Sequence, residues 1–550
     1  MHLYHLVERA ATEYPRKTFI KYEKESITFR QLQDHSLSLA HLLFKKGVRP
    51  GTHVAVLMDN HPDYITALFA IMRLNAVFVP INNFLKGEEI EYILKDSETR
   101  LLICSSRFSR LAATVQKHGV NILYGGKDSA EKQPNIHDTP ANTETLPRLS
   151  EDERSLAFLL YTSGTTGHPK GVMLSHNNLV SNLRSIKGAF GDFLHSRRRF
   201  LLFLPLFHTF PLTANLLLPL FLGCTLRLFP GVRPFRPIMR SLLTEGMDVF
   251  IAVPAIYSVL SKAKIPWYVR LFLGKKIYIS GGSPLAEETF HSINRKLPGM
   301  VLEGYGLSEC SPVVSFNPPD KSKVRSVGPP LPEVEVKVVD DDLCELPCNV
   351  EGELIVRGPN VMEGYYGNPQ ESAQALHNGW LRTGDIARID EDGYIFIVDR
   401  LKDLIISKGM NIYPREVEEV LYKHEGVEHA AVLGLPDKQL EEIPVAFIVK
   451  SSEYRGHLDE VVLKKYLRPH IANYKIPRQF HFIDDIPLNA TGKVMKRELR
   501  EQIQAAMDYL RDQHDSSADN SETRAEPPPL VEQTQLLEAT REESEKKHET

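Results

Sequence analysis

Short apolar runs alternate with helical patterns along the first 400 residues of the chain. Pro62 stands where a helix tolerates proline, in its first turn, and Ile65–Leu74 continues that helix. Short apolar runs between helical patterns predict a largely parallel, layered α/β architecture. The runs expected to form buried strands are His53–Met58, Ala76–Ile81, Leu101–Cys104, Ile122–Tyr124, Ala157–Tyr161, Val249–Val253 and Ile277–Ile279.

The pattern changes after Asp399, where the charged stretch Arg400–Lys402 separates the apolar runs FIV and LII. The expected organisation is a large domain over residues 1–400, a small α+β domain over 401–505 and a tail over 506–550. The tail is rich in Glu, Ser, Thr and Gln, a composition that is typical of disorder. The small domain is expected to contain helices over Glu416–His424 and Leu458–Leu467 and strands over Ala430–Leu433 and Val445–Val449.

One apolar segment, Phe200–Leu226, contains no Asp, Glu, Lys or Arg and is long enough to cross a bilayer. Three prolines, His208 and Asn215 interrupt it, and proline breaks both helices and sheet ladders. We therefore expect a buried strand, loop and helix here and no transmembrane segment. The first 18 residues carry charged side chains and no long apolar stretch, so no signal peptide is expected.

Composition narrows the setting of the protein. A chain of 550 residues is too long for one compact core, and a formal net charge of -4 gives no basic field for nucleic acid. The five cysteines are scattered and form no CxxC pair or metal-ligand spacing, which suits a reducing compartment. The expected location is the cytoplasm.

The stretch YTSGTTGHPKGV, residues 161–172, follows an apolar run and combines small hydroxyl residues with glycines and a lysine. Glycine lets backbone N–H groups approach an anion closely, hydroxyls donate to phosphate oxygens, and lysine supplies charge. The spacing is not that of the common P-loop. On these residues alone, a flexible connection remains the alternative. The candidate phosphate-binding residues are Thr162, Ser163, Gly164, Thr165, Thr166, Gly167 and Lys170.

This stretch resembles the phosphate-loop signature of the adenylate-forming superfamily, which includes acyl-CoA synthetases, firefly luciferase and peptide-synthetase adenylation domains. Further strings match family motifs in family order over roughly residues 20–500: GYGLSE (304–309), TGD (383–385), DRLKDLIISKGMNIYP (399–414) and NATGK (489–493). The resemblance implies a large multi-sheet N-terminal α/β domain and a small, mobile α+β C-terminal domain. It also implies ATP, Mg²⁺ and coenzyme A.

The resemblance assigns nucleotide-binding roles by position. Glu309 is the Mg²⁺ candidate, because a hard cation with several phosphate oxygens needs few protein ligands. Ser308, in place of the more usual threonine, would contact the α-phosphate. The adenine would be contacted by Tyr305, Gly306, Gly281 and Gly282. Asp385 would accept hydrogen bonds from the ribose hydroxyls, and Arg400 would contact the ribose or phosphate.

Two lysines of the C-terminal part are expected to serve the two half-reactions. Lys493 resembles the lysine that stabilises charge as a carboxylate attacks the α-phosphate. The family then rotates its small domain, and Lys402 matches the hinge residue. The segment around Gly409 would line the pantetheine tunnel.

The acid is inferred from the apolar segment. His208 falls in the region of the carboxylate pocket, and the absence of an acidic residue leaves a substrate ammonium without a partner, which disfavours amino acids. The Leu- and Phe-rich lining suits an alkyl chain. The stretch 378–402 resembles fatty acyl-CoA synthetases, although coumarate-type ligases share most of it.

The leading hypothesis is therefore a fatty acyl-CoA ligase of AMP-forming type, acting as a monomer or homodimer. Activation of an aryl acid, loading of a carrier protein, luciferase-like oxygenation and a non-catalytic binding role are the alternatives. Peripheral membrane contact is left open, because fatty acids partition into membranes. Asn75 and Glu441 stand where relatives often have glycine, and they are expected to bear on backbone turns more than on activity.

Overall fold

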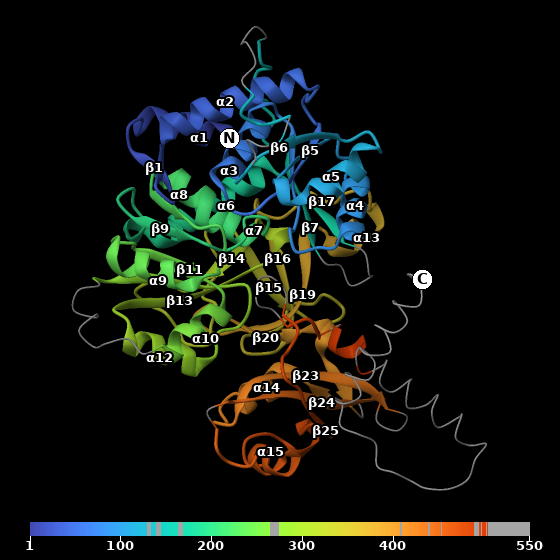
Figure 1. Cartoon of the computed structure of the whole chain (residues 1–550). Helices are drawn as coiled ribbons and strands as arrows, with labels where there is room; N and C mark the ends of the chain where they lie inside the picture. Colours follow the sequence, from blue (N-terminus) through green and yellow to red (C-terminus); the bar gives the residue numbers. More distant parts are fainter. Residues whose placement is uncertain are drawn as a thin grey trace, which may run out of the picture. The chain divides into compact units, whose positions relative to one another are not determined.

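The computed structural model describes residues 1–128, 132, 134–138, 145–162, 169–263, 274–407, 410–437, 441–452, 454–488, 494–496, 498–501 and 503. The chain divides into two compact units (Figure 1). Unit 1 comprises Met1–Thr383 and Arg388–Phe396, and unit 2 comprises Gly384–Ala387 and Ile397–Thr550. Several mixed sheets with helices, and a separate sheet-rich C-terminal part, confirm the predicted α/β class.

The first sheet of unit 1 has seven described strands in the order β17-β8-β7-β4-β3-β5-β6. Strands β7, β4, β3, β5 and β6 run parallel, while β8 and β17 join antiparallel at one edge. The strands are β3 (His53–Leu57), β4 (Val77–Pro80), β5 (Leu101–Cys104), β6 (Asn121–Tyr124), β7 (Leu156–Thr162), β8 (Lys170–Ser175) and β17 (Gly364–Tyr365). The five predicted strands in this region are confirmed.

The second sheet has eight described strands in the order β14-β13-β12-β11-β9-β10-β1-β2. Its central strands are parallel, and β2 and β14 close its two edges antiparallel. The strands are β1 (Thr18–Tyr22), β2 (Glu25–Thr28), β9 (Arg199–Leu202), β10 (Thr225–Leu228), β11 (Val249–Ala252), β12 (Lys276–Ser280), β13 (Gly299–Gly306) and β14 (Val313–Phe316).

Helix α3 (Pro62–Arg73) begins at the predicted proline and is buried along nearly its whole length. It packs within a core cluster that draws on both large sheets. The other helices described in unit 1 are α1 (Tyr4–Glu13), α2 (Phe29–Lys45), α4 (Gly87–Asp96), α5 (Ser109–Gln116), α6 (His176–Phe190), α7 (Thr209–Pro211), α8 (Leu218–Leu222), α9 (Phe235–Thr244), α10 (Pro254–Lys262), α12 (Glu287–Lys296) and α13 (Pro369–Ala375).

The uncharged segment 200–226 forms strand, loop and helix, as predicted. Strand β9 leads into α7, a π-helix over Leu212–Leu217 and then α8, and most of these side chains are buried. No helix among the described residues is long and apolar enough to span a membrane.

A third sheet carries the chain from unit 1 into unit 2. Its order is β15-β16-β19-β18, with β20 paired to β19. The boundary between the units passes through β19 and β20. The strands are β15 (Glu335–Val339), β16 (Gly352–Arg357), β18 (Leu376–His377), β19 (Trp380–Ile389) and β20 (Ile395–Arg400).

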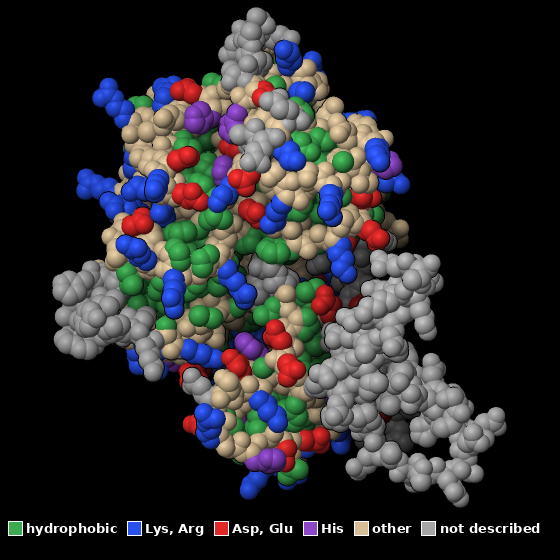
Figure 2. Space-filling view, viewed as in Figure 1, with side chains coloured by type: hydrophobic (Ala, Val, Ile, Leu, Met, Phe, Trp, Pro, Cys, Tyr) green, Lys and Arg blue, Asp and Glu red, His purple; other side chains and the backbone are tan. Residues whose placement is uncertain are grey.

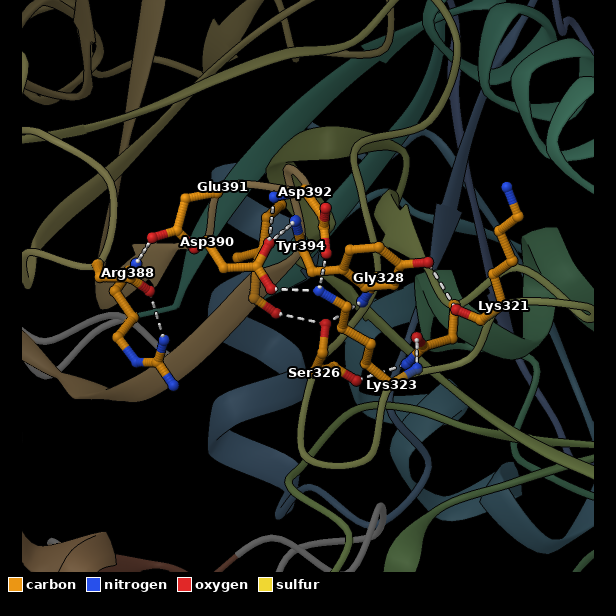
Figure 3. A network of polar contacts seen from close by, with 12 residues as sticks. Lys321, Lys323, Ser326, Gly328, Arg388, Asp390, Glu391, Asp392 and Tyr394 are labelled. Atoms are coloured by element: carbon orange, nitrogen blue, oxygen red, sulfur yellow. Dashed lines mark hydrogen bonds and ion pairs between the residues drawn. The ribbon is translucent and has the colours of Figure 1, made fainter.

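The turn between β19 and β20 is tied to the loop before β15 (Figure 3). Lys323 Nζ lies 2.6 Å from a carboxylate oxygen of Asp390 and 2.6 Å from one of Asp392. The Tyr394 hydroxyl donates to the carbonyl of Lys321 at 2.6 Å. Desolvation opposes ionisation of Asp390, but the hydrogen bond and charge of Lys323, together with backbone N–H bonds from Asp392 and Tyr394, outweigh it and lower the pKa of that carboxyl. The hairpin tip is therefore fixed within unit 1.

Unit 2 contains a sheet of order β22-β21-β24-β23 with β25 beside β24. The predicted helices and strands of this part are all present. They are β21 (Ile405–Ser407), β22 (Met410–Ile412), α14 (Pro414–Leu421), β23 (Val427–Asp437), β24 (Glu441–Lys450), α15 (Glu460–Leu467) and β25 (Gln479–Phe482). Strands β23 and β24 are longer than predicted, because their pairing continues to Asp437 and Glu441.

Asn75 and Glu441 both adopt left-handed backbone conformations, with φ of 55° and 66°. This region is open to glycine and costly for most other residues, which explains the glycine expected at both positions. The side chain of Asn75 offsets that cost, since it donates to the carbonyl of Arg148 at 2.8 Å and accepts from the N–H of Ser150 at 2.7 Å.

Positive and negative side chains are interspersed over the visible face of the described residues (Figure 2). This distribution agrees with the small formal net charge of -4.

Candidate active site

The candidate phosphate loop connects β7 to β8. Thr162 and Lys170 face each other as the last pair of this antiparallel ladder. Below them, the Tyr161 hydroxyl donates to Asp96 at 2.6 Å, and burial raises the pKa of Tyr161 well above its usual value, so it remains a donor. The connecting candidates Ser163, Gly164, Thr165, Thr166 and Gly167 lie outside the described residues.

Glu309 lies just beyond the end of β13, within a short 3-10 turn over Ser308–Cys310. Its side chain is half-buried, and its carboxylate oxygen Oε1 accepts a hydrogen bond from the Tyr365 hydroxyl at 3.1 Å. Strand β13 delivers Tyr305 and Gly306 just before this turn. A side chain at Gly306 would place Cβ 2.1 Å from the carbonyl oxygen of Pro312, so only glycine fits.

The segment of residues 358–372, here called the clamp, joins the phosphate hairpin to the Glu309 turn. Its strand β17 pairs with β8, and the N–H of Met362 donates to the carbonyl of Glu309 at 2.8 Å. At its far end, Glu371 forms an ion pair with Lys170. Glu371 lies in α13, and Figure 1 shows α13 close to β17, the edge strand of the first sheet that pairs with β8. The clamp therefore contacts both the phosphate-binding candidate Lys170 and the metal candidate Glu309.

Hydrogen bonds also bring the Glu309 turn to the segment that carries His208. The Thr209 hydroxyl lies 3.0 Å from that of Ser308. A Cβ at Gly281 would lie 3.0 Å from the ring of Phe210, so the SGGSP loop closely approaches the same segment. Gly282 follows with φ of 87°, a conformation that favours glycine. Three of the predicted site segments thus meet in unit 1.

His208 lies at the start of α7, against the ring of Phe207 at a centroid distance of 4.4 Å. Its Nε2 is buried and has no hydrogen-bond partner among the described residues. Burial lowers the pKa of His208 from 6.5 to about 4. The imidazole is therefore neutral at physiological pH, and it keeps one unused polar atom.

The predicted residues of unit 2 form a separate group. Arg400 Nε lies 3.2 Å from Asp385 Oδ1, and the carboxylate of Asp385 is 8% exposed. Asp399 accepts backbone N–H bonds from Arg400 at 2.7 Å and from Arg415 at 2.9 Å, which fixes the entry to the hinge candidate. The side chain of Lys402 is exposed in the following 3-10 turn.

Gly409 and Lys493 lie outside the described residues. Close to Lys493 in sequence, Lys496 Nζ lies 3.0 Å from Glu418 Oε1, with both side chains largely buried. Burial opposes the charge on Lys496, but the negative charges of Glu418, Asp403 and Asp399 together outweigh it and raise the pKa of this lysine. The pair attaches the segment of residues 494–496 to α14.

Tyr365, Glu371, Thr209 and Lys496 are polar contacts of the site segments that the sequence did not single out. Each is an ordinary residue type in an unremarkable string, and only the fold places it beside a motif. The string GYYGNPQES, which follows GPNVME, was the available signal for the clamp. Two described cavities, of about 520 and 150 Å³, contain none of the candidate site residues.

Comparison with known proteins identifies the family of the chain. A family model described as AMP-binding enzyme matches residues 7–366, and one described as AMP-binding enzyme C-terminal domain matches residues 416–493.

Among curated relatives, the long-chain-fatty-acid–CoA ligase of Salmonella typhimurium is 34% identical over 539 residues, which cover 92% of this chain and 95% of that protein. Feruloyl-CoA synthase of an Amycolatopsis species is 34% identical over 496 residues, 90% and 97% of the two chains. Among solved structures, the o-succinylbenzoate coenzyme A synthetase of Bacillus subtilis in complex with ATP and magnesium ion has a TM-score of 0.80 and 29% identity, with 90% and 99% of the chains covered. The chain therefore belongs to the AMP-binding enzymes, the adenylate-forming superfamily whose motifs it carries.

Proposed function

We propose that this chain, an ATP-dependent acid–CoA ligase, acts on a medium- or long-chain fatty acid. The observation that carries the choice of acid is the largely buried segment of residues 200–222, which has no Asp, Glu, Lys or Arg and contains the neutral His208. An alkyl chain gains free energy from such a lining, and an amino acid would leave its ammonium unpaired. The similarity to the long-chain-fatty-acid–CoA ligase supports the same choice.

An aryl acid is the second candidate. The similarity to feruloyl-CoA synthase is as high as that to the fatty-acid ligase, at 34% identity. A planar ring would also suit an apolar lining. Measured preference between the two acids decides between these candidates.

In the proposed first half-reaction, the acid carboxylate attacks the α-phosphorus of ATP to give an acyl-adenylate and pyrophosphate. The phosphate loop and Lys170 bind the triphosphate, and Ser308 contacts the α-phosphate. Tyr305, Gly306, Gly281 and Gly282 surround the base, while Asp385 and Arg400 bind the ribose. Lys493 stabilises the charge that develops during attack, and the unused polar atom of His208 orients the carboxylate.

The residues present fit a magnesium ion bound by one protein carboxylate. No group of three or more His, Cys, Asp and Glu side chains that could hold a metal occurs in the described part of the chain. Glu309 supplies the carboxylate, and Mg²⁺ commonly takes one or two carboxylates together with phosphate oxygens and waters. The ion would neutralise charge on the phosphates during transfer.

In the proposed second half-reaction, the thiol of coenzyme A attacks the acyl carbon and AMP leaves. Rotation about Lys402 removes Lys493 and brings the segment around Gly409 to the thiol's path. The anchoring of the β19–β20 turn within unit 1 supports a pivot beyond that turn. The corresponding domain organisation is 1–400, 401–505 and a tail over 506–550.

A cytoplasmic location is supported by the five free cysteines, since none of them forms a disulfide. Peripheral contact with membranes would follow from the partition of a fatty-acid substrate into the lipid bilayer. The proposed assembly state is a monomer or a homodimer. Cell fractionation and light scattering measure these properties.

The decisive experiment compares acyl-CoA formation from acids of increasing chain length and from aryl acids, with Mg-ATP and coenzyme A. A preference for fatty acids supports the proposal. A preference for aryl acids would retain the chemistry and replace the substrate.

A further inference from the structure

The clamp, residues 358–372, makes contacts that bear on the proposed metal site. The backbone N–H of Met362 in the clamp donates a hydrogen bond to the carbonyl of Glu309 at 2.8 Å. Its middle strand, β17, is bonded to β8 next to the phosphate loop, and the N–H of Tyr366 donates to the carbonyl of Gly171 at 2.8 Å. The clamp therefore sets the position of the Glu309 turn relative to the phosphate hairpin.

The clamp itself is held rigidly. Asn178 of α6 donates to the carbonyls of Pro359 at 2.9 Å and Val361 at 2.8 Å. Ser372 accepts from the N–H of Tyr365 at 2.8 Å and donates to the carbonyl of Asn368 at 2.7 Å. Hydrogen bonds on both sides of Tyr365 in the sequence therefore hold its backbone in place.

Tyr365 reaches from this backbone to both charged candidates. Its hydroxyl donates to Glu309 Oε1 at 3.1 Å, and Lys170 Nζ lies 5.6 Å from the centroid of its ring. Lys170 is in turn paired with Glu371, four residues before the end of α13. One side chain therefore contacts the carboxylate proposed for the metal and the lysine proposed for the phosphates.

We propose that Tyr365 is a positioning residue for the metal: its hydroxyl fixes the orientation of the Glu309 carboxylate toward a Mg-nucleotide. The proposal rests on the role proposed for Glu309. A carboxylate on a short turn can rotate about its side-chain torsions, and a hydrogen bond to one oxygen restricts that rotation. Removal of a residue that hydrogen-bonds to a metal ligand typically weakens metal affinity by ~10–100-fold.

The test uses the full-length protein with Tyr365→Phe, which removes the hydroxyl and keeps the ring beneath Lys170. Tyr366→Phe is the matched control, because its ring packs against His53 at a centroid distance of 5.2 Å and its backbone bond is unaffected by the change. Manganese binding is measured by electron paramagnetic resonance in the presence of a non-hydrolysable ATP analogue. Binding of the analogue without metal is measured by calorimetry.

We expect Tyr365→Phe to weaken manganese affinity by about 10-fold and to leave metal-free binding of the analogue unchanged. Tyr366→Phe should match the wild type in both measurements. In turnover assays, the magnesium concentration for half-maximal rate should rise in Tyr365→Phe, and saturating magnesium should restore kcat.

A double-mutant cycle separates positioning from packing. On the background Glu309→Gln, the change Tyr365→Phe should have no further effect on manganese affinity, because the group that it orients is already altered. Unchanged manganese affinity in Tyr365→Phe, an equal loss of metal-free binding, or a full effect on the Glu309→Gln background would each overturn the proposal. Metal binding is read without substrate acid, so a wild type inactive on every acid would contradict the proposed function and not this inference.

Discussion

Acid should destabilise unit 1 through a pair of buried histidines. His2 and His176 are each 1% exposed, and their ring centroids are 3.7 Å apart. Each Nδ1 accepts a backbone hydrogen bond, His176 from Leu3 at 3.3 Å and His2 from Tyr4 at 3.2 Å. Burial, followed by neighbouring positive charge, lowers the pKa of His2 from 6.5 to about 3 and that of His176 from 6.5 to about 2.

The sign follows from proton linkage. Between the folded and unfolded pKa values, the unfolded chain binds protons that the folded chain refuses, so stability falls as the pH falls below 6.5. One pKa unit corresponds to ~1.4 kcal/mol. At a pH of about 5, each histidine therefore costs about 2 kcal/mol and the pair about 4 kcal/mol.

The measurement is urea unfolding of the wild type and His176→Asn at pH of about 7 and about 5. Asparagine keeps an acceptor near the position of Nδ1 and cannot be protonated. Trp380 belongs to unit 1, so its fluorescence follows the transition of this unit, and Trp267 lies outside the described residues. The loss of unfolding free energy on acidification should be about 2 kcal/mol smaller in His176→Asn than in the wild type.

His118→Asn is the control, because His118 is an exposed histidine of unit 1. The hydrogen bond to Asp63 is the chief cause that raises the pKa of His137, so protonation of His137 stabilises the folded state as the pH falls. This contribution is the same in the wild type and in His176→Asn, and it therefore cancels in the difference between them. An equal pH dependence in the wild type and His176→Asn would refute this reasoning.

Three further changes test other parts of the account. Lys493→Ala should lower acid-dependent pyrophosphate release by ~10²–10³-fold and leave thioester formation from a preformed acyl-adenylate unchanged. Both rates are measured by rapid quench, and an equal loss of both would contradict the role of Lys493. Lys496→Met should destabilise unit 2 by about 2 kcal/mol, because the buried carboxylate of Glu418 loses the lysine that lies 3.0 Å from it. An unchanged unfolding temperature of unit 2 in calorimetry would contradict this prediction. Asn75→Gly should destabilise unit 1 by about 1 kcal/mol, because two side-chain hydrogen bonds are lost; a denaturation midpoint that does not fall would be inconsistent with this argument.

The sequence predicted the elements with strong apolar patterns and could not predict how the sheets are ordered. His53–Met58 and Val249–Val253 form strands because their side chains are buried on both faces, and an apolar run reports that burial directly. The placement of β9 between β11 and β10 depends on contacts between distant segments, which no local pattern contains. The extension of β23 and β24 likewise depends on their pairing with each other.

The candidate site was predicted to the extent that its residues stand in motifs. Glu309 and Lys170 were named from their strings, and the structure connects them through the clamp. Tyr365 and Thr209 escaped notice because a tyrosine or threonine has no distinctive chemistry in sequence, and its partner is more than 50 residues away. Long-range hydrogen bonds of this kind become visible only when the fold is known.

Asp385 and Arg400 illustrate an intermediate case. The motifs suggested ligand contacts for both, and the structure also pairs them with each other at 3.2 Å. A buried carboxylate needs such a partner whether or not a nucleotide is bound. The ion pair therefore gives Asp385 and Arg400 a structural role next to the hinge candidate Lys402, in addition to the proposed contacts with the nucleotide.

The most direct test of the central claim is acyl-CoA formation by the purified protein with Mg-ATP, coenzyme A and acids from acetate through palmitate to ferulate. The account predicts the highest kcat/KM for a medium- or long-chain fatty acid, with one AMP and one pyrophosphate formed for each acyl-CoA. Absence of acyl-CoA and of acid-dependent pyrophosphate with every acid, from protein shown to be folded, would contradict it.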